Sequence, residues 1–367
     1  MKKLKLISLF CGCGGLDFGF KQVGFKTILA NDIDKDSCNS FYNFLNIKPI
    51  CCDLKKIINN LPYADIVIGG PPCQSFSLLG KRNKDDLRGK EVFNFLYAVE
   101  KIRPKVILFE NVPGIINSTI NNIRLSDYII NQIKKLGYNI FFEKLDCTEF
   151  LIPQTRKRYI LIAWEKNLKK PIICNKEKLS SFLKLKLDSE KTTIKNALGD
   201  LPKPVKNGKV SYLFKQKTFF QRFCRKFSDS KFTTVHYNFH MSPKDIEYIH
   251  YIKPGGNYMD IPNRIASKRV KRIKKTGGRT TTYGRLHPEK FSATINTYFN
   301  RPNVGTNYHY NQKRLITPRE ALRIQSFPDT FTPEYKSIRS ICKQIGNAVP
   351  PLFGIFLALT VKSIFRK

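Results

Sequence analysis

The first half of the chain alternates short apolar runs with amphipathic segments. Apolar runs of strand length recur at Leu6–Phe10, Lys26–Ala30, Ile66–Ile68, Val106–Phe109 and Tyr159–Ala163. Segments with helical periodicity lie between them, at Gly15–Val23, Lys35–Leu45, Val92–Lys101 and Ile120–Leu136. Because strands that alternate with helices build parallel βαβ units, this pattern predicts an α/β fold with a doubly wound, mostly parallel sheet.

The pattern changes between about residue 165 and residue 310. Lys-rich, aromatic and turn-prone segments follow one another there without clean periodicity, which predicts a second, smaller domain or a large insertion. Regular structure returns after Arg314, where Thr317, Pro318 and Glu320 fit the cap, first and third positions of a helix. Leu352–Ile364 predicts a closing apolar helix.

The composition is that of a globular and strongly basic protein. Hydrophobic residues make up 41% of the 367 residues, and the formal net charge is +37. This charge favours a polyanionic partner, nucleic acid before an anionic membrane. Lysine far outnumbers arginine, and Ile and Asn are frequent, as in proteins from genomes of biased base composition. The net charge is therefore supporting evidence only.

One stretch concentrates the positive charge. Arg264 to Arg279 holds eight basic residues and no acidic one. A charge run is usually a solvated surface. Here glycines at its end and the aromatic residues Tyr283, Tyr298 and Phe299 nearby favour contact with nucleic acid over that interpretation.

Other classes of protein and site are disfavoured. No signal segment is visible at the N-terminus, and no apolar run approaches the roughly 20 residues of a membrane span. The ten cysteines are scattered without Cys-x-x-Cys pairs, which predicts a cytoplasmic protein with reduced thiols and no structural zinc. His236 and His240 lack an acidic or cysteine partner at ligand spacing, so no metal site is expected.

A glycine-rich turn connects the first predicted strand to the first helix, in the sequence Phe10-Cys11-Gly12-Cys13-Gly14-Gly15-Leu16-Asp17. Glycines let the backbone approach a ligand closely. The next strand ends at Asp32, which places a carboxylate where it can accept hydrogen bonds from ribose hydroxyls. Such a turn fits NAD, FAD and S-adenosylmethionine equally well.

A single cysteine follows the third predicted strand, in the sequence Gly69-Gly70-Pro71-Pro72-Cys73-Gln74-Ser75-Phe76-Ser77. The two prolines stiffen the backbone before Cys73, and open α/β sheets carry reacting groups at the carboxyl ends of their strands. This thiol is a candidate nucleophile. An ordinary buried cysteine on a turn is the other interpretation, and the motif alone does not decide between them.

Two further motifs carry charged side chains near this edge. Glu110 follows the strand Val106–Phe109 and should emerge at the same sheet edge as Cys73, either as a proton donor or as a turn cap. Arg156 and Arg158 precede the strand Tyr159–Ala163. Residues i and i+2 of an extended segment share a face, so the two guanidinium groups are expected side by side, where they suit phosphate or carbonyl oxygens.

Together, these motifs resemble the DNA cytosine-5 methyltransferase family, most closely its bacterial restriction–modification members. The resemblance covers nearly the whole chain, and its motifs occur in order: the turn at 10–19, the loop at 71–77, Glu110-Asn111-Val112, Gln154-x-Arg156-x-Arg158, Arg314–Glu320 with Gln325–Asp329, and Gln344–Pro350. Within the variable region at 165–310, only Ala293-Thr294-Ile295 looks familiar.

The resemblance implies a covalent mechanism. Cys73 would add to C6 of a flipped cytosine, Glu110 would bond N3, and Arg158 would bind O2. Arg156 would hold a phosphate or steady the loop. The residues expected at the DNA are Gln74, Ser75, Ser77, Arg88, Lys271, Arg272, Lys274, Lys275, Arg279 and Thr294, the first four on a mobile loop that closes over the duplex.

The resemblance also implies S-adenosylmethionine as the cofactor. Its expected contacts are Phe10, Gly12, Gly14, Gly15, Asp32, Ile33, Asp53, Pro71 and Asn347. Asp32 would take the ribose hydroxyls, Ile33 the adenine face and Asp53 the adenine amino group. Ile33 stands where family members often have a bulkier residue, which predicts looser packing on adenine.

The implied organisation has three segments. Residues 1–170 would form the catalytic and cofactor-binding domain, 171–312 the target-recognition domain, and 313–367 a segment that returns to complete the catalytic domain. We expect a cytoplasmic monomer that acts on double-stranded DNA without a metal or a membrane, with a possible cognate restriction endonuclease.

Three alternatives are weaker. A tRNA cytosine-5 methyltransferase would have a compact variable region, whereas this one is long and basic. An NAD-dependent oxidoreductase would leave Cys73 and Glu110 unexplained. A non-catalytic DNA-binding relative would not be expected to keep the full set of Cys73, Glu110 and the two arginines.

Overall fold

The computed structural model describes residues 3–72, 90–120, 123–188, 191–227 and 231–366. These residues form two compact units. The first unit contains Met1–Cys147, Lys157–Asn175 and Phe353–Lys367, and the second contains Thr148–Arg156 and Lys176–Leu352. The chain therefore leaves and re-enters each unit, and its two ends belong to the same one.

The first unit is built on a seven-stranded sheet with the strand order β3-β2-β1-β4-β5-β10-β8. The strands, in that order, are Ile50–Cys51, Lys26–Asp32, Lys5–Leu9, Ile66–Gly69, Val106–Asn111, Lys157–Glu165 and Tyr138–Asp146. The five strands from β3 to β5 are parallel, whereas β10 runs antiparallel to both β5 and β8. This confirms the predicted α/β fold with a mostly parallel sheet.

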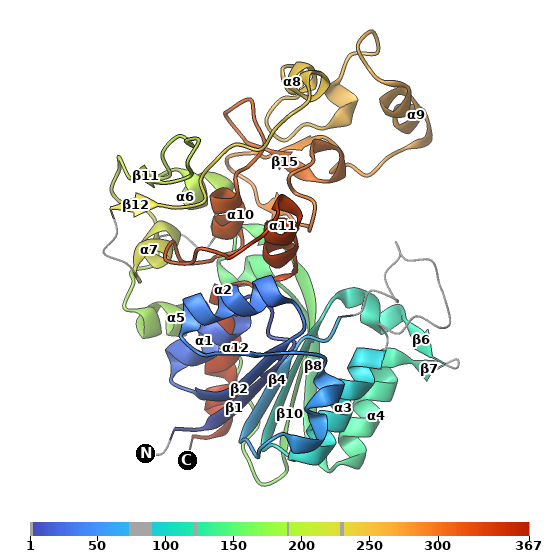
Figure 1. The fold of residues 1–367 in the computed structure, drawn as a ribbon, viewed down its shortest axis with the longest axis vertical. Helices are drawn as coiled ribbons and strands as arrows, with labels where there is room; N and C mark the ends of the chain where they lie inside the picture. The colour runs from blue at the N-terminus through green and yellow to red at the C-terminus, as the bar shows by residue number, and fades with distance from the viewer. Residues whose placement is uncertain (1–2, 73–89, 121–122, 189–190, 228–230, 367) are drawn as a thin grey trace. The chain divides into compact units, whose positions relative to one another are not determined.

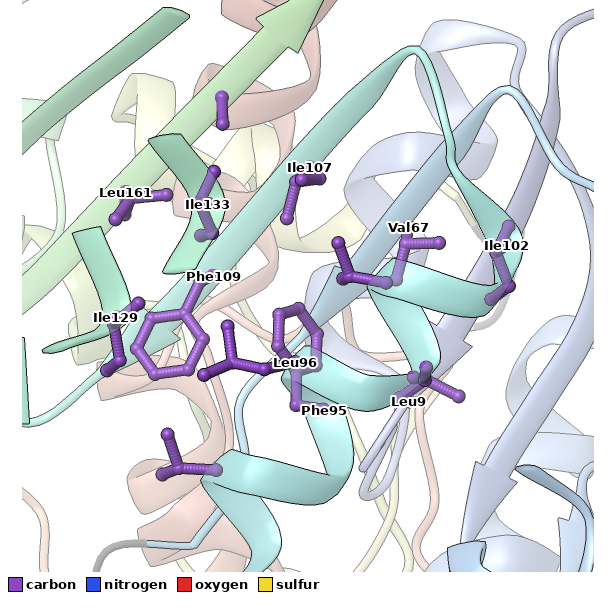
Figure 2. Packing of buried hydrophobic residues seen from close by; sticks show 14 of the residues in the cluster. Leu9, Val67, Phe95, Leu96, Ile102, Ile107, Phe109, Ile129, Ile133 and Leu161 are labelled. Carbon is purple, nitrogen blue, oxygen red and sulfur yellow. The ribbon is translucent and has the colours of Figure 1, made fainter. Parts of the chain in front are cut away.

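Helices cover both faces of this sheet (Figure 1). They are α1 (Gly15–Val23), α2 (Lys35–Leu45), α3 (Lys90–Ile102), α4 (Leu125–Lys135) and α12 (Pro351–Ile364), with short 3₁₀ turns at Leu54–Lys56, Ile58–Asn60 and Pro113–Asn117. One core lies between the sheet and α3 and α4, where Phe95 packs edge-on against Phe109 and Val67, Ile107, Ile129 and Leu161 surround them (Figure 2). Alternate residues of each strand supply this layer.

The C-terminal helix α12 is apolar on all sides and is a core element. Pro351 to Val361 are buried throughout, which is how an all-round apolar helix is accommodated in a folded chain. The stretch Ile338–Ile364, which includes α12, has the length and apolar composition of a membrane span, contrary to the sequence-based expectation, but 89% of its most apolar window is buried. Its apolar side chains are therefore used for packing.

Helices α1 and α12 touch through glycine. A Cβ on Gly19 would lie 2.1 Å from the carbonyl carbon of Gly354, and a Cβ on Gly354 would lie 2.9 Å from the Leu16 carbonyl oxygen. At the far end of α1, the Lys362 ammonium donates to the Val23 carbonyl oxygen at 2.9 Å. Only glycine allows the two backbones to approach this closely.

The second unit has short elements and long connections. Its helices are α5 (Lys176–Leu183), α6 (Ile194–Leu198), α7 (Phe219–Arg225), α8 (Pro243–Ile249), α9 (Lys268–Thr276), α10 (Pro318–Ile324) and α11 (Ile338–Asn347). Its strands pair in twos: β11 (Val210–Ser211) with β12 (Phe232–Thr233), β13 (Gly284–Arg285) with β15 (Thr306–Tyr308), and β14 (Ser292–Ala293) with β9 (Gln154–Thr155). Further 3₁₀ turns lie at Cys147–Phe150, Tyr258–Asp260 and Pro302–Val304.

Buried ion pairs around α10 organise this irregular unit. Arg323 is fully buried and bonds Asp329 at 2.5 Å and Asp200 at 2.9 Å. The predicted capping box is confirmed, because Thr317 Oγ1 accepts from the Glu320 amide and the Thr317 amide donates to Glu320 Oε2. Charged groups so fully desolvated are tolerated only with partners, and here each has at least one.

Some predicted elements differ from the observed ones. The helix predicted from Ile120 begins at Leu125, because Thr119–Ile120 (β6) and Ile123–Arg124 (β7) pair as antiparallel strands, for which β-branched residues are suited. The strands β3 and β8 were not predicted, because β3 has only two residues and β8 is an edge strand whose apolar run is interrupted by charged residues.

His236 has a structural role among the described residues. Its two ring nitrogens bond the Thr317 hydroxyl and the Pro202 carbonyl oxygen.

The close contact of α1 and α12 gives a first prediction. Gly19→Ala should lower the free energy of unfolding by about 3 kcal/mol, because the methyl group overlaps the Gly354 backbone. Urea denaturation measures this. Gly137→Ala is the control, since no atom lies within 4 Å of the added methyl and the cost is limited to about 1 kcal/mol of backbone strain at positive φ. Equal losses in the two variants would contradict the packing argument.

Candidate active site and cofactor site

The glycine-rich turn is fastened to the neighbouring strand through a carboxylate. Phe10, Gly12 and Gly14 all have positive φ, at 57°, 53° and 87°. The Gly12 amide donates to Asp32 Oδ2 at 2.8 Å, and the Asp34 amide donates to Asp32 Oδ1 at 2.9 Å. The turn between β1 and α1 is thus held against the carboxyl end of β2, in the conformation that the glycines permit.

Three predicted cofactor residues lie at the carboxyl ends of β2 and β3. Burial raises the pKa of Asp32, although hydrogen bonds from the amides of Asp34 and Gly12 partly offset this. Ile33 follows it with 72% of its surface exposed, and Asp53 caps the 3₁₀ turn after β3 by accepting from the Lys55 amide at 2.9 Å. An exposed aliphatic side chain beside a hydrogen-bonding carboxylate fits a nucleoside, which needs an apolar surface and polar partners.

The second site is an ion pair at the end of β5. Arg158 Nε and Glu110 Oε1 are 2.8 Å apart, and both side chains are about nine-tenths buried. Strand β10 runs antiparallel to β5, so its first residues meet the last residues of β5. The Arg158 guanidinium also donates from Nη1 to its neighbouring Lys157 carbonyl at 2.7 Å, which fixes its plane.

The segment that leads to Cys73 passes beside Glu110. Strand β4 is parallel to β5 and ends at Gly69, and a Cβ on Gly70 would lie 2.9 Å from Glu110 Oε2. Asn111 Nδ2 then donates to the Pro71 carbonyl oxygen at 2.9 Å. Glu110 and the Gly70–Pro71 segment therefore lie at one sheet edge. The described residues reach Pro72, so the expected position of Cys73 at this edge stays a prediction.

Several predicted residues lie outside the described part of the chain. These are Cys73 and the DNA-contacting candidates Gln74, Ser75, Ser77 and Arg88. Their roles therefore remain predictions.

The expectation that Arg156 and Arg158 lie side by side is wrong. Arg156 is fully buried in the second unit, where it donates to the Ala348 carbonyl at 2.7 Å and to the Gly346 carbonyl at 3.2 Å. The residue stands between the short strand β9 and the long strand β10, so the regular alternation of an extended chain does not hold across it. Arg156 therefore fixes the backbone after α11.

The other candidates of the second unit occupy different settings. Thr294 is exposed and donates to the Thr155 carbonyl at 2.6 Å, next to the β9–β14 pairing, and Asn347 is exposed at the end of α11. On α9, Lys271, Arg272 and Lys275 are exposed, as is Arg279 beyond its end. Lys274 differs, because its ammonium bonds the Ile261 carbonyl and it is half-buried.

Two further side chains of these motifs, Asn111 and Asp17, were given no role from the sequence. Asn111 ties the Pro71 carbonyl to β5, and Asp17 is buried in the first turn of α1. The sequence feature that could have drawn attention to Asn111 is its position directly after Glu110. For Asp17 this feature is a carboxylate among apolar and glycine residues in the first turns of the helix, from Gly15 to Phe20.

The Glu110–Arg158 pair gives a second prediction. Arg158→Met should lower the free energy of unfolding by about 3 kcal/mol, because it leaves the Glu110 carboxylate desolvated without a partner. Adding Glu110→Gln should recover part of this loss, with a coupling energy of about 2 kcal/mol in a double-mutant cycle measured by urea denaturation.

An exposed ion pair provides the control for this cycle. Lys195 and Glu289 are 3.4 Å apart with 66% and 57% of their side-chain surfaces exposed. Its coupling energy should be about 0.5 kcal/mol or less. If the Glu110–Arg158 pair gives a value no larger than this, the two side chains do not depend on each other.

Comparisons with known proteins agree with this geometry. Residues 4–363 match the family model described as C-5 cytosine-specific DNA methylase. The chain is 31% identical over 365 residues to type II methyltransferase M.FnuDI of Fusobacterium nucleatum, covering 98% of this chain and 94% of that protein. It is 30% identical over 372 residues to type II methyltransferase M.NgoFVII of Neisseria gonorrhoeae, covering 99% and 87%.

Solved structures show the same fold. A protein described as a DNA modification methyltransferase encoded within an Escherichia coli prophage superposes with a TM-score of 0.74 at 24% identity, over the full length of both chains. The Dnmt2 methyltransferase of S. pombe superposes with a TM-score of 0.61 at 14% identity, over 98% of this chain and 99% of the other. With the family match over nearly all residues, the chain belongs to the C-5 cytosine-specific DNA methylases, which use S-adenosylmethionine, and is a DNA (cytosine-5)-methyltransferase of the type II restriction–modification kind.

Proposed function

We propose that this enzyme methylates cytosine at C5 through a covalent adduct between Cys73 and C6 of a base flipped out of duplex DNA. The observation that supports this most is the buried Glu110–Arg158 pair, against which the Gly70–Pro71 segment rests immediately before Cys73. A buried acid and a fixed guanidinium beside a nucleophile's loop suit the recognition of the amide-like edge of a cytosine.

The chemistry follows from the weak nucleophilicity of C5. The Cys73 thiolate adds to C6, and the electron pair of the 5,6 double bond moves to C5, which is then able to attack an electrophilic carbon. S-adenosylmethionine, when bound, supplies that carbon as a methyl group on a sulfonium. A base then removes the C5 proton, and elimination of the thiolate restores the double bond and frees Cys73.

Glu110 and Arg158 would act on the other edge of the ring. Glu110 would bond N3 and stabilise the charge that develops there when sulfur adds to C6. Arg158 uses Nε for Glu110 and Nη1 for the Lys157 carbonyl, and Nη2 has no partner in the described part of the chain. We assign Nη2 to O2 of the base, because Nε and Nη1 hold the guanidinium in one orientation.

The residues around the glycine-rich turn would hold the cofactor. Asp32 and Asp53 would accept from the ribose and from the adenine amino group, and the exposed Ile33 would cover one adenine face. Phe10, Gly12, Gly14 and Gly15 would approach the methionine end through their backbone, with Pro71 and Asn347 completing the set.

The three sequence segments would divide catalysis and target recognition between them. Residues 1–170 with 313–367 would carry catalysis, and 171–312 would recognise the target, where the exposed basic residues of α9 would hold the DNA backbone. Thr294 would brace the flipped nucleotide. We further propose a cytoplasmic monomer that protects DNA from a cognate restriction endonuclease.

Cys73→Ser tests the covalent mechanism. The variant should lose methyl transfer by at least about 10⁴-fold while DNA and S-adenosylmethionine affinities stay within threefold, since the hydroxyl is a far weaker nucleophile than a thiolate. Duplex DNA carrying 5-fluorocytosine should form an adduct with the wild-type enzyme that survives denaturation, because fluorine cannot leave C5 as a proton does. Substantial activity in the variant would sink the covalent mechanism.

The exposed side chains of α9 give a separate prediction. Replacing Lys271, Arg272 and Lys275 by Gln should weaken DNA binding and reduce the slope of log affinity against log salt by about 2 to 3. Fluorescence anisotropy at several salt concentrations measures this slope. The matched control replaces Lys134, Lys135 and Lys144, which are exposed in the first unit. An unchanged slope would mean that α9 does not touch phosphates.

A further inference from the structure

Asp17 occupies an unusual position for a carboxylate. It stands at the third position of α1, directly after the glycine-rich turn, and only 1% of its surface is exposed. The N-cap residue of α1 is Gly14, which has no side chain and therefore leaves the helix without a side-chain cap. The carboxylate therefore lies behind the turn on which the methionine end of the cofactor would rest.

No cation among the described residues balances this charge. Neither carboxylate oxygen makes a hydrogen bond of good geometry there, although the Ser8 hydroxyl and the helix amide lie close enough to offset part of the effect of burial. The lysines of α1 and α12 are engaged elsewhere: Lys21 donates to the Leu45 carbonyl and Lys362 to the Val23 carbonyl. Burial raises the pKa of Asp17 to about 7.

None of the groups that face Asp17 in the described part of the chain supplies a positive charge. Ser8 comes from β1, the thiols of Cys11 and Cys13 come from the turn, and both thiols also feel the negative charge of Asp32 at the end of β2. The amides at a helix start favour an anion, which partly stabilises the carboxylate. A desolvated carboxylate without a partner is nevertheless costly, and such cost usually persists where a ligand relieves it.

We propose that Asp17 is the counter-charge of the cationic cofactor and that it favours S-adenosylmethionine over the demethylated product. This inference rests on the proposed cofactor site. S-adenosylmethionine carries one positive charge more than S-adenosylhomocysteine, because methyl transfer converts its sulfonium into a neutral thioether. A negative charge fixed behind the turn stabilises the bound cationic S-adenosylmethionine more than the bound neutral product. This difference in affinity favours replacement of S-adenosylhomocysteine by new S-adenosylmethionine after each turnover.

The pH dependence has a definite sign. Without ligand, Asp17 is mostly protonated at pH 6 and mostly ionised at pH 8. A cationic ligand favours the ionised form, so the affinity for S-adenosylmethionine should rise about fivefold between these pH values. For S-adenosylhomocysteine the rise should be about twofold or less, since that ligand carries no net charge.

Asp17→Asn removes the charge while keeping the shape of the side chain. Isothermal titration calorimetry at pH 6 and pH 8 should show that the variant binds S-adenosylmethionine about tenfold more weakly than the wild type at pH 8. At pH 6 this difference should shrink to about twofold, because only a small fraction of Asp17 is ionised there. Any ionisation of the ligand between these pH values affects its binding to both proteins equally. The difference in affinity between wild type and variant therefore reports the charge of Asp17 alone. The Tm of the ligand-free variant should be equal or higher, because a buried unpaired charge has been removed.

The control is Asp127→Asn, which changes a carboxylate at the same third position of α4, where it is exposed. Its ligand affinities should match those of the wild type at both pH values. Equal loss of affinity for both ligands in Asp17→Asn, or a wild-type pH difference that persists in the variant, would overturn the counter-charge role. Failure of the wild-type protein to bind S-adenosylmethionine at all would instead contradict the proposed cofactor site.

Discussion

The register of three neighbouring strands is the constraint on which the Glu110–Arg158 ion pair depends. Strands β4 and β5 are parallel, so Gly70 and Glu110 emerge at the same edge. Strand β10 enters the sheet antiparallel to β5, so that its beginning, with Arg158, meets the end of β5. A shift of one residue in β10 would turn Arg158 to the opposite face of the sheet and leave Glu110 buried without its cation.

Buried charge is handled in two different ways in this chain. Around α10 and at the end of β5, each buried cation is matched by a carboxylate, as for Arg323 with Asp329 and for Arg158 with Glu110. Asp17 differs, since it is as deeply buried but has no cation among the described residues. Paired buried charges favour one arrangement of the fold. An unpaired buried charge destabilises the ligand-free protein, and a ligand of opposite charge removes this cost when it binds.

The packing of the first unit brings the C-terminal helix α12 against α1, which begins directly after the glycine-rich turn. Gly19 and Gly354 let α1 and α12 approach within backbone contact, and α1 begins at the glycine-rich turn. The C-terminal helix thus supports the element that positions Asp17 and the turn. Gly354, more than 300 positions away in sequence, thus constrains the helix that follows the glycine-rich turn.

The sequence by itself determined the class of fold, the order of the motifs and several local structures. Alternating strand and helix patterns predicted α1 and α2 to the residue, and the Thr317–Glu320 capping box follows from local hydrogen bonding alone. The family follows from short motifs that keep their order and spacing. Such features depend on neighbours in sequence, so the residues themselves are sufficient evidence.

Only the tertiary structure decided how the charged side chains are used. Spacing placed Arg156 and Arg158 on one face, but the backbone between β9 and β10 sends Arg156 to the carbonyls after α11 and Arg158 to Glu110. From the sequence, Lys274 is indistinguishable from the other basic residues of α9, whereas in the structure its ammonium donates to the Ile261 carbonyl. The partner of a charge is chosen by burial and by long-range contacts, and these depend on the packing of segments far apart in the chain.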